Sequence, residues 1–580
     1  MKKNVLALSI AAAVAGFAGS AHAITDIAAA ANVAATTAEA LRFGNTGTGH
    51  SLLVPYFSTQ NGNMTLLALT NTDQRNGKAV KVRFRGAQNS DDLFDFQVFL
   101  SPGDVWTAGV VRGADGRSQL ITSDNSCTKP AKSVINGRSF GTSRLNPALS
   151  DADKAAGTRE GYVEIFNMAD IEPNVSSDVA GGVAGTITDG LGLYPIIKHV
   201  NGVAPCANIA ANVVTGTVRN DAWTFIDGTD ATPDRLYAEL TAAPAAATAH
   251  QTVGMANPTT GLLANWTIIN VPNATSWTGS AAAIEAVTAP AAPGVPALAA
   301  GTLIYYPQTD RSAGSAAQIA AGTADPLLIP ATDRTGAAVP ASITALKVDL
   351  PDMSTSYTKV GGALVTPSVQ AANLATSIST SSLNNEFWAN ADISGATDWV
   401  MSMPTRRYAT AVHYTMPQAT ATADAYTAGS TVRAPGRVFN AANAQHFAAA
   451  NTSLRNGVAC VTGIDYTLFD REERVQNRVG GGVVVSPAEP GARLVFCGET
   501  SVVAFNSAGA TASPVLGAAV TLSGIDSNFN EGWARLTTPG AVAGGLPILG
   551  AAFASAYHPQ VSAGTSGNYS MTWEHRYVRP

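Results

Sequence analysis

The feature that most constrains the fold is a series of strand-length runs in which apolar and polar residues alternate. In Val80–Arg85 three apolar residues alternate with three basic ones, and Phe94–Leu100 repeats the alternation. Successive side chains of a strand point to opposite faces, so the first run predicts a half-buried strand with one face in water. Asn76-Gly77 just before it favours a type I′ hairpin turn, because both residues tolerate positive φ. The pattern predicts antiparallel β-sandwich-like domains.

Strand candidates continue along the chain, and helix candidates are few. Further strand-length runs are Leu52–Phe57, Met64–Thr70, Lys78–Arg85, Tyr162–Phe166, Trp266–Val271, Leu303–Tyr306, Asp398–Met403, Gly481–Val485, Leu494–Cys497 and Trp533–Leu536. Asn440–Asn451 is one of the few segments that favour a helix. Thr241–His250 and Gly279–Gly301 are rich in Ala and Pro, which is typical of linkers or long surface loops. We expect a mainly β fold with long Ala/Gly/Pro-rich loops and few short helices.

The length of 580 residues predicts roughly two to four domains. We expect an N-terminal β domain at 46–240, a middle region with linkers and strands at 241–345, and a C-terminal β domain at 346–580. No fixed repeat of 20 to 50 residues is present, which disfavours propellers and solenoids.

Residues 1–23 are typical of a secretory signal peptide. Two lysines precede an apolar stretch, and an A-x-A site predicts cleavage after Ala23. A retained membrane anchor would need about 20 apolar residues, more than this stretch offers. An Ala-rich N-terminal arm follows at 24–45, either a short helix or a flexible segment. We expect export to the cell surface or extracellular space, or alternatively to the periplasm, with no transmembrane segment in the mature chain.

The cysteines support the same compartment. Four are present, and none form a C-x-x-C pair. An even number in an exported chain favours disulfides over metal ligation. Three connectivities are possible, and the grouping of two cysteines in each half favours Cys127–Cys206 and Cys460–Cys497.

The charge excludes one class of partner. Only 13% of residues are charged, against about 25% in typical soluble domains. The net charge of −6 and pI near 5.8 argue against a nucleic-acid binder, which would carry a basic face. The most basic local cluster is Arg406-Arg407, which favours an internal ion pair and, as the alternative, contact with lipopolysaccharide phosphates.

No catalytic motif stands above background. Gly137–Gly141 matches G-x-S-x-G, but a nucleophile elbow needs a buried strand before it and a helix after it. The histidines are dispersed, without metal-ligand spacing. Glu386 and Asp398 each lie beside a tryptophan, the arrangement of a sugar-stacking platform with carboxylates, although solvated acids beside strand-edge aromatics give the same pattern.

One segment resembles an oxygen-rich calcium loop. Asp526, Asn528 and Asn530 alternate, but the following glycine is one position too late for an EF-hand. An ordinary Asx-turn is favoured, and calcium is the only cofactor that the sequence suggests.

Several segments together resemble a family of proteobacterial secreted proteins described as cell-surface or surface-layer-like. The segments that carry the resemblance are Leu52–Trp106, Arg159–Asp170, the Cys206 region, Asn265–Val271, Val348–Tyr357, Asn384–Tyr408 and Glu531–Leu536. The resemblance implies a location and a structural role, and it supplies no catalytic residues.

From these observations we expect an exported structural protein that associates with copies of itself into a surface layer, sheet or filament. Outer-membrane lipopolysaccharide or a surface polysaccharide is a further candidate partner. The alternative is a secreted hydrolase or carbohydrate-binding protein that uses Glu386 and Asp398.

Overall fold

The computed structural model describes residues 38–176, 187–189, 192–208, 221–226, 253–289, 296–305, 352–418, 432–439, 445–477, 493–506, 510–539, 544–563 and 565–579. Within them the chain is mainly β and its sheets are antiparallel, as the alternation predicts. One pair departs from this rule, because β27 (Thr500–Phe505) and β28 (Leu522–Ile525) run parallel. The signal peptide, its cleavage site after Ala23, residues 24–37 of the arm and the strand candidate at 481–485 lie outside the described residues.

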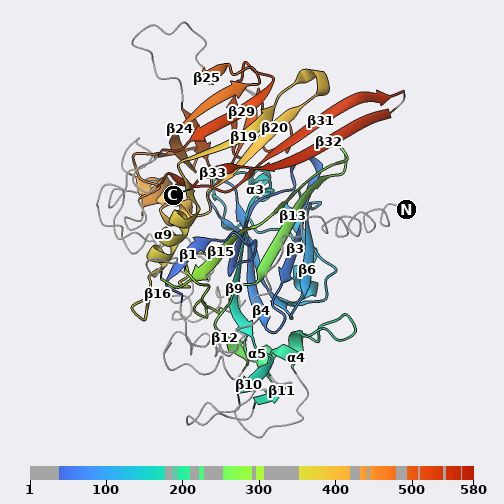
Figure 1. The fold of residues 1–580 in the computed structure, drawn as a ribbon, viewed down its shortest axis with the longest axis vertical. Helices are drawn as coiled ribbons and strands as arrows, with labels where there is room; N and C mark the ends of the chain where they lie inside the picture. The colour runs from blue at the N-terminus through green and yellow to red at the C-terminus, as the bar shows by residue number, and fades with distance from the viewer. Residues whose placement is uncertain are drawn as a thin grey trace.

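Two facing sheets form the N-terminal sandwich, blue to green in Figure 1. The first has the order β1-β15-β2-β9-β4-β5-β8, with β12 also paired to β9: β1 (Ala40–Phe43), β15 (Ala282–Val287), β2 (Ser51–Ser58), β9 (Glu160–Ile171), β4 (Gly77–Gly86), β5 (Asp92–Leu100), β8 (Cys127–Lys129) and β12 (Met255–Ala256). The second has the order β14-β13-β3-β6-β7: β14 (Thr275–Ser280), β13 (Leu262–Asn270), β3 (Asn63–Asn71), β6 (Val105–Arg112) and β7 (Ser118–Ile121).

Two further sheets form the C-terminal sandwich. The outer sheet has the order β23-β24-β29-β19-β33, with β25 and β26 also paired to β24: β23 (Thr452–Arg455), β24 (Val458–Asp470), β29 (Glu531–Thr537), β19 (Ser382–Trp388), β33 (Arg576–Val578), β25 (Val475–Asn477) and β26 (Leu494–Cys497). The inner sheet has the order β28-β27-β20-β31-β32, adding β20 (Ala396–Ser402), β31 (Ala551–Ser562) and β32 (Thr565–Glu574). Short pairs complete the strands: β10 (Asn174–Ser176) with β11 (Ile187–Asp189), β16 (Lys359–Val360) with β17 (Ala363–Leu364), β18 (Ser379–Thr380) with β30 (Leu546–Pro547), and β21 (Thr410–Gln418) with β22 (Val432–Phe439).

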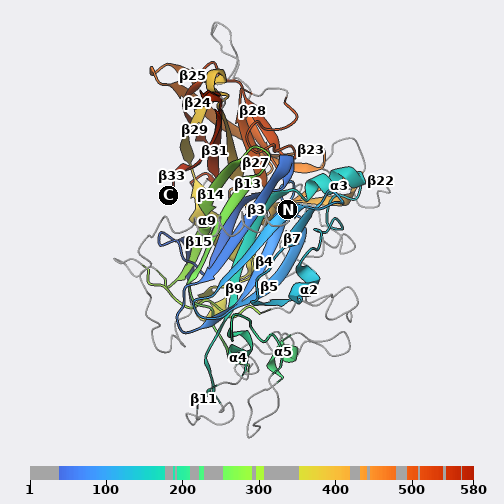
Figure 2. The ribbon, with the colours of Figure 1, turned by 90° about the vertical axis from the view of Figure 1, so that its right-hand side faces the viewer.

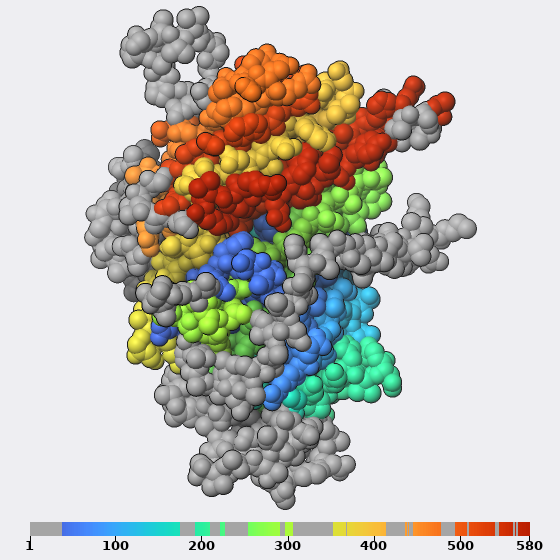
Figure 3. All heavy atoms as spheres, viewed as in Figure 1, coloured from blue at the N-terminus to red at the C-terminus, as the bar shows by residue number. Residues whose placement is uncertain are grey.

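The central part of the inner sheet, formed by β20, β27 and the first residues of β31, is buried on both faces, and this fuses the two sandwiches. Val400 and Phe553 join the core of the N-terminal sandwich, whereas Trp399 and Ala552 pack against the outer sheet. Alternate residues of β20 and β31 therefore serve two different cores. Figure 3 shows the red and yellow strands of the C-terminal half lying directly on the blue and green half.

Helices and loops cover the other face of the first sheet. The described helices are α2 (Lys132–Ile135), α3 (Asp151–Gly157), α4 (Tyr194–Ile197), α5 (Ala222–Phe225) and α9 (Pro367–Ile378), with the 3-10 turns η2 (Gln60–Gly62), η4 (Ala391–Ile393) and η5 (Arg406–Tyr408). Apolar residues of α4, α5 and α9 share one core cluster with β9; Figure 2 shows α4 and α5 below the sheets. The expected helix at 440–451 is wrong where it can be checked, because 445–451 form turns. Among the described residues no helix has the length and apolar character needed to span a membrane.

One Ala-rich segment, expected to be a linker or long surface loop, contains a strand, and the other, Thr241–His250, lies outside the described residues. Within Gly279–Gly301, β15 pairs on one side with β1 and on the other with β2. Its small side chains Ala283 and Ala286 are buried, so they pack closely where larger residues would not fit. The strands of the middle region therefore belong to the N-terminal sheets, while Leu303–Tyr305 is not a strand. The end of the arm forms β1 within the chain's own sheet.

The expected wet face of β4 is also buried. Lys81, Arg83 and Arg85 are all at most 2% exposed, because loops from both halves cover this face. Each of these cations pairs with a carboxylate. The alternation therefore predicted the strand correctly, but the prediction that its basic face is exposed to solvent was wrong.

Candidate functional site

The two carboxylates beside tryptophans do not form a pair. Glu386 is exposed on the outer face of β19. Asp398 is fully buried on β20 and faces the N-terminal sandwich. The Trp399 ring packs in the core between the two sheets, and its Nε1 donates to the Glu386 carbonyl oxygen at 3.0 Å. A shared acid–base role for Glu386 and Asp398 is therefore contradicted by their positions on opposite sides of a packed core.

Asp398 instead holds a loop in place. Its Oδ2 accepts hydrogen bonds from Ser513 Oγ and from the backbone N–H groups of Val515 and Leu516, the last at 2.7 Å. Burial raises the pKa of Asp398 to about 7, opposed by these three donors. Glu160 of the N-terminal sandwich accepts from Ala519 in the same loop, and burial raises its pKa too. Asp398 thus holds this loop on β20 of the same half, and Glu160 fastens the loop to the N-terminal half.

A different aromatic surface lies beside Glu386. Trp533 is directly opposite Glu386 in the β19–β29 pair and stacks on Phe469 of β24, with ring centroids 4.0 Å apart. Both rings are half-buried on the outer sheet. The Arg535 guanidinium lies 5.8 Å from the Trp533 ring and donates to Asn384 at 3.0 Å. A flat aromatic pair flanked by a carboxylate, a guanidinium and an amide is suited to stacking on a sugar ring.

The proposed calcium residues lie on an exposed loop after β28. Asp526, Asn528 and Asn530 are exposed, and Gln476 bonds to the backbone at Asp526 and Asn528. Ser527 forms a local turn with Phe529. In the part of the chain that the structure describes, no group of three or more His, Cys, Asp or Glu could hold a metal. Calcium remains a prediction.

The basic pair Arg406-Arg407 is buried, as the internal-pair interpretation expects. Arg406 pairs with Glu499 at 2.7 Å, and Arg407 with Asp352 at 3.3 Å. Although burial opposes it, the guanidinium of Arg407 and those of β4 lower the pKa of Asp352. The pair is at most 4% exposed and therefore cannot contact lipopolysaccharide phosphates.

Both disulfides have the favoured connectivity. Cys127–Cys206 joins β8 to a covering loop, and Cys460–Cys497 links directly opposite residues of β24 and β26. The G-x-S-x-G segment is a turn in which Ser139 bridges Gln119 of β7.

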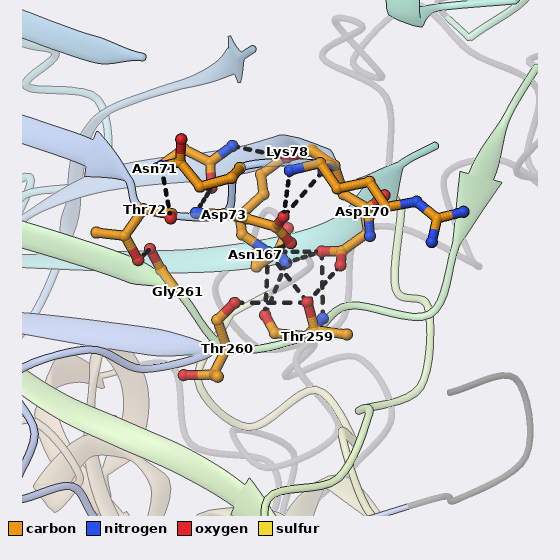
Figure 4. Close-up of polar contacts among 12 residues, drawn as sticks. Asn71, Thr72, Asp73, Lys78, Asn167, Asp170, Thr259, Thr260 and Gly261 are labelled. Atoms are coloured by element: carbon orange, nitrogen blue, oxygen red, sulfur yellow. Dashed lines mark hydrogen bonds and ion pairs between the residues drawn. The ribbon is translucent and has the colours of Figure 1, made fainter. Parts of the chain in front are cut away.

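Sequence reasoning missed a buried polar cluster between β4 and β9, shown in Figure 4. Lys78 Nζ lies 2.9 Å from Asp170 Oδ1. The same oxygen accepts from Asn167 Nδ2 at 2.6 Å, and Thr259 donates to Asp170 through both its N–H and its hydroxyl. The sequence signal that could have indicated this cluster is the set of polar residues within β9. The structure shows that every residue of β9 is buried.

The second missed feature is the β31–β32 hairpin. At its base Ser570 of β32 exchanges hydrogen bonds with the backbone of Ser276 in β14. Farther out, Tyr557 and Tyr569 are 42% and 50% exposed. They border a surface hollow of about 380 Å³ together with Ile393. The end of the hairpin stands clear of the body in Figures 1 and 3.

No family model matches the chain, and no curated protein or solved structure matches it. The resemblance to surface-layer-like proteins therefore stays a prediction.

Proposed function

We propose that the protein is an exported structural protein of the cell surface that self-associates through the β31–β32 hairpin. The observation that carries the proposal is the exposure of two tyrosines on a strand pair that extends beyond both sandwiches. Tyr569 lies opposite Ala556 and Tyr557 opposite Asn568, so the two rings lie on opposite faces of the hairpin. Tyrosine suits interfaces, since its ring buries apolar area while its hydroxyl finds a hydrogen-bond partner.

The edge of β32 provides the second half of the contact. Within the described residues, β31 is the only strand that pairs with β32 along the backbone. Ser570 and Asn568 fasten that edge to Ser276 and Asn273, which leaves the part of β32 nearest the end of the hairpin to accept a strand from a second copy. A head-to-tail contact that does not close on itself would produce filaments or sheets rather than rings.

Two further observations support the location. The chain has a leader-like N-terminus, and its two disulfides persist in an oxidising compartment. Its low content of charged residues gives weakly repelling surfaces, which favour packing of many copies.

The test compares the mature protein with a Tyr557→Ser/Tyr569→Ser variant by negative-stain electron microscopy and sedimentation velocity in millimolar calcium. The matched control is Val360→Ser/Leu364→Ser, which removes two exposed apolar side chains from the β16–β17 hairpin. We expect ordered assemblies for the wild type and the control and single particles for the tyrosine variant. A monomeric wild type, or a tyrosine variant that assembles normally, would contradict the proposal. Repeating the assay with EDTA tests the calcium prediction at Asp526.

The stacked Phe469–Trp533 surface favours a second candidate function, binding of a surface polysaccharide. Aromatic faces beside polar groups bind sugar rings by stacking and hydrogen bonding. We expect Trp533→Ala to weaken binding to purified lipopolysaccharide or capsular polysaccharide at least about tenfold, and Tyr569→Ser to leave it unchanged. Equal binding by Trp533→Ala and wild type would remove this candidate. The hydrolase alternative has no support, because its two carboxylates are separated by the core.

A further inference from the structure

Three hydrogen-bonded polar side chains, a lysine, an asparagine and an aspartate, are enclosed between β4 and β9. Lys78 and Asn167 are 0% exposed and Asp170 is 1% exposed. Lys78 and Asp170 are direct partners across the two strands. Asn167, three residues from Asp170, would face the other side of a regular strand. A register shift next to Ala79 inserts one extra residue in β9 and turns Asn167 towards the same group.

The lysine amine and the asparagine amide share two acceptors. Asp170 Oδ1 lies 2.9 Å from Lys78 Nζ and 2.6 Å from Asn167 Nδ2. The Thr259 carbonyl oxygen lies 3.4 Å from Lys78 Nζ and 3.1 Å from Asn167 Nδ2. Figure 4 shows the lysine and asparagine side chains meeting at Asp170, with Thr259 below them. The amine therefore lies beside the carboxamide and on the same carboxylate.

The amide group is also held in one orientation. Both partners of Asn167 Nδ2 are acceptors, which identifies that atom as the nitrogen. Its Oδ1 is buried, and the described residues provide no hydrogen-bond partner for it. A buried carbonyl oxygen without a donor is rare in a settled hydrogen-bond network. A purely structural role for the cluster therefore does not explain the unpaired Oδ1 of Asn167.

We propose that Lys78 and Asn167 form an intramolecular isopeptide bond, with Asp170 as the proton-transfer group. Asp170 removes a proton from the Lys78 ammonium, and the neutral Nζ attacks Cγ of Asn167. The Nζ–Cγ bond forms, the Cγ–Nδ2 bond breaks, and Asp170 passes the proton to the leaving nitrogen. The products are a secondary amide and ammonia, which takes up the second ammonium proton and leaves as ammonium. No oxidant, metal or cofactor is consumed.

The surroundings favour this reaction over the competing hydrolysis. Holding amine and amide together gives effective concentrations far above those in solution. Burial keeps water away from the carbonyl carbon and strengthens the interactions of Asp170 with both reactants. The bond would join two neighbouring strands at the centre of the N-terminal sandwich.

The first test is the mass of the folded, reduced wild-type protein, which needs no variant. The reaction predicts a mass about 17 Da below that calculated from the sequence of the purified chain, the mass of one ammonia. Trypsin with Glu-C should give 76–81 joined to 165–198, because Pro173 blocks cleavage after Glu172, without cleavage after Lys78. An unshifted mass with cleavage after Lys78 would overturn the proposal.

Variants then separate the chemistry from the fold. Asp170→Asn keeps the amine and the amide but removes the proton-transfer group, and Lys78→Met removes the amine. Both variants should have the mass calculated from their own sequences, without the loss of one ammonia. Lys81→Met is the matched control, because Lys81 is a buried lysine of the same strand that pairs with Asp95. Lys81→Met should keep the mass deficit of about 17 Da. Loss of the deficit in this variant would indicate that a lysine other than Lys78 forms the bond.

Discussion

The Arg406–Glu499 pair allows a quantitative test of how the two halves are fastened. Both side chains are 0% exposed, and Nη2 of Arg406 lies 2.7 Å from Oε2 of Glu499. Arg406 also donates to the Gln88 carbonyl oxygen of the N-terminal sandwich at 3.3 Å. Glu499→Gln removes the negative charge and leaves a buried guanidinium without a counter-ion. Loss of one partner from a buried pair costs about 3–5 kcal/mol.

The assay is urea unfolding followed by tryptophan fluorescence at pH 7.5. Glu531→Gln is the control, because the Arg471–Glu531 pair has the same 2.7 Å separation but side chains 71% and 37% exposed. An exposed pair contributes about 0–1 kcal/mol. The double variant Arg406→Met/Glu499→Leu removes both charges and should recover most of the lost stability.

Acid provides an independent check of the same pair. Burial raises the pKa of Glu499, so the folded protein binds this proton more tightly than the unfolded chain. Wild-type stability therefore rises relative to that of Glu499→Gln as the pH falls through the raised pKa, and the cost of Glu499→Gln should be larger in acid than at pH 7.5. Equal small costs for Glu499→Gln and Glu531→Gln at pH 7.5 would refute the reasoning, as would a double variant as unstable as Glu499→Gln.

Three further predictions use unfolding free energies. Burial raises the pKa of Asp398 to about 7, so the stabilisation from its protonated form is present below pH 4 and is lost as the pH rises through 7. Urea titrations should therefore show the unfolding free energy of Asp398→Asn rising relative to that of wild type between pH 5 and 8, by up to a few kcal/mol. Burial lowers the pKa of His575 to about 3, so stability is lost as the pH falls from 6.5 to 3, and the destabilisation by His575→Gln should be smaller at pH 4 than at pH 7; an unchanged difference would contradict this. Cys460→Ser/Cys497→Ser opens a link with a sequence separation of 37 and should lower the unfolding free energy by about 3–4 kcal/mol, whereas no change from wild type under non-reducing conditions would show that the bond does not contribute.

Local sequence signals located most of the described strands, because alternation and turn residues act over a few positions. They failed where burial depends on distant partners. The sequence predicts that the basic face of β4 is exposed to solvent, because only the folded chain brings Glu164 and Asp352 to Arg85 from elsewhere. The Ala-rich sequence of β15 predicts a linker, because the neighbouring residues in the sequence give no indication that Ala283 and Ala286 are buried in a tightly packed core.

The candidate sites divide in the same way. Trp533 could be identified as a surface aromatic of a strand, but only the strand order places it opposite Glu386 and beside Phe469. The Lys78–Asp170 cluster combines residues 92 positions apart with a register shift that no sequence pattern indicates. Disulfide pairing was predictable, since proximity along the chain already favours the observed connectivity.

The strand order also determines when the chain can fold. β1 at Ala40 pairs with β15 at Val287, and β19 at Ser382 pairs with β33 at Val578, close to the end of the chain. Sheets built on such distant pairs form slowly, because a long loop must close before any contact stabilises it. Neither sandwich can be completed while its last strand is still being synthesised. For the export proposed here, each sandwich would stay open until its own last strand has crossed the membrane, β15 for the N-terminal sandwich and β33 for the C-terminal one.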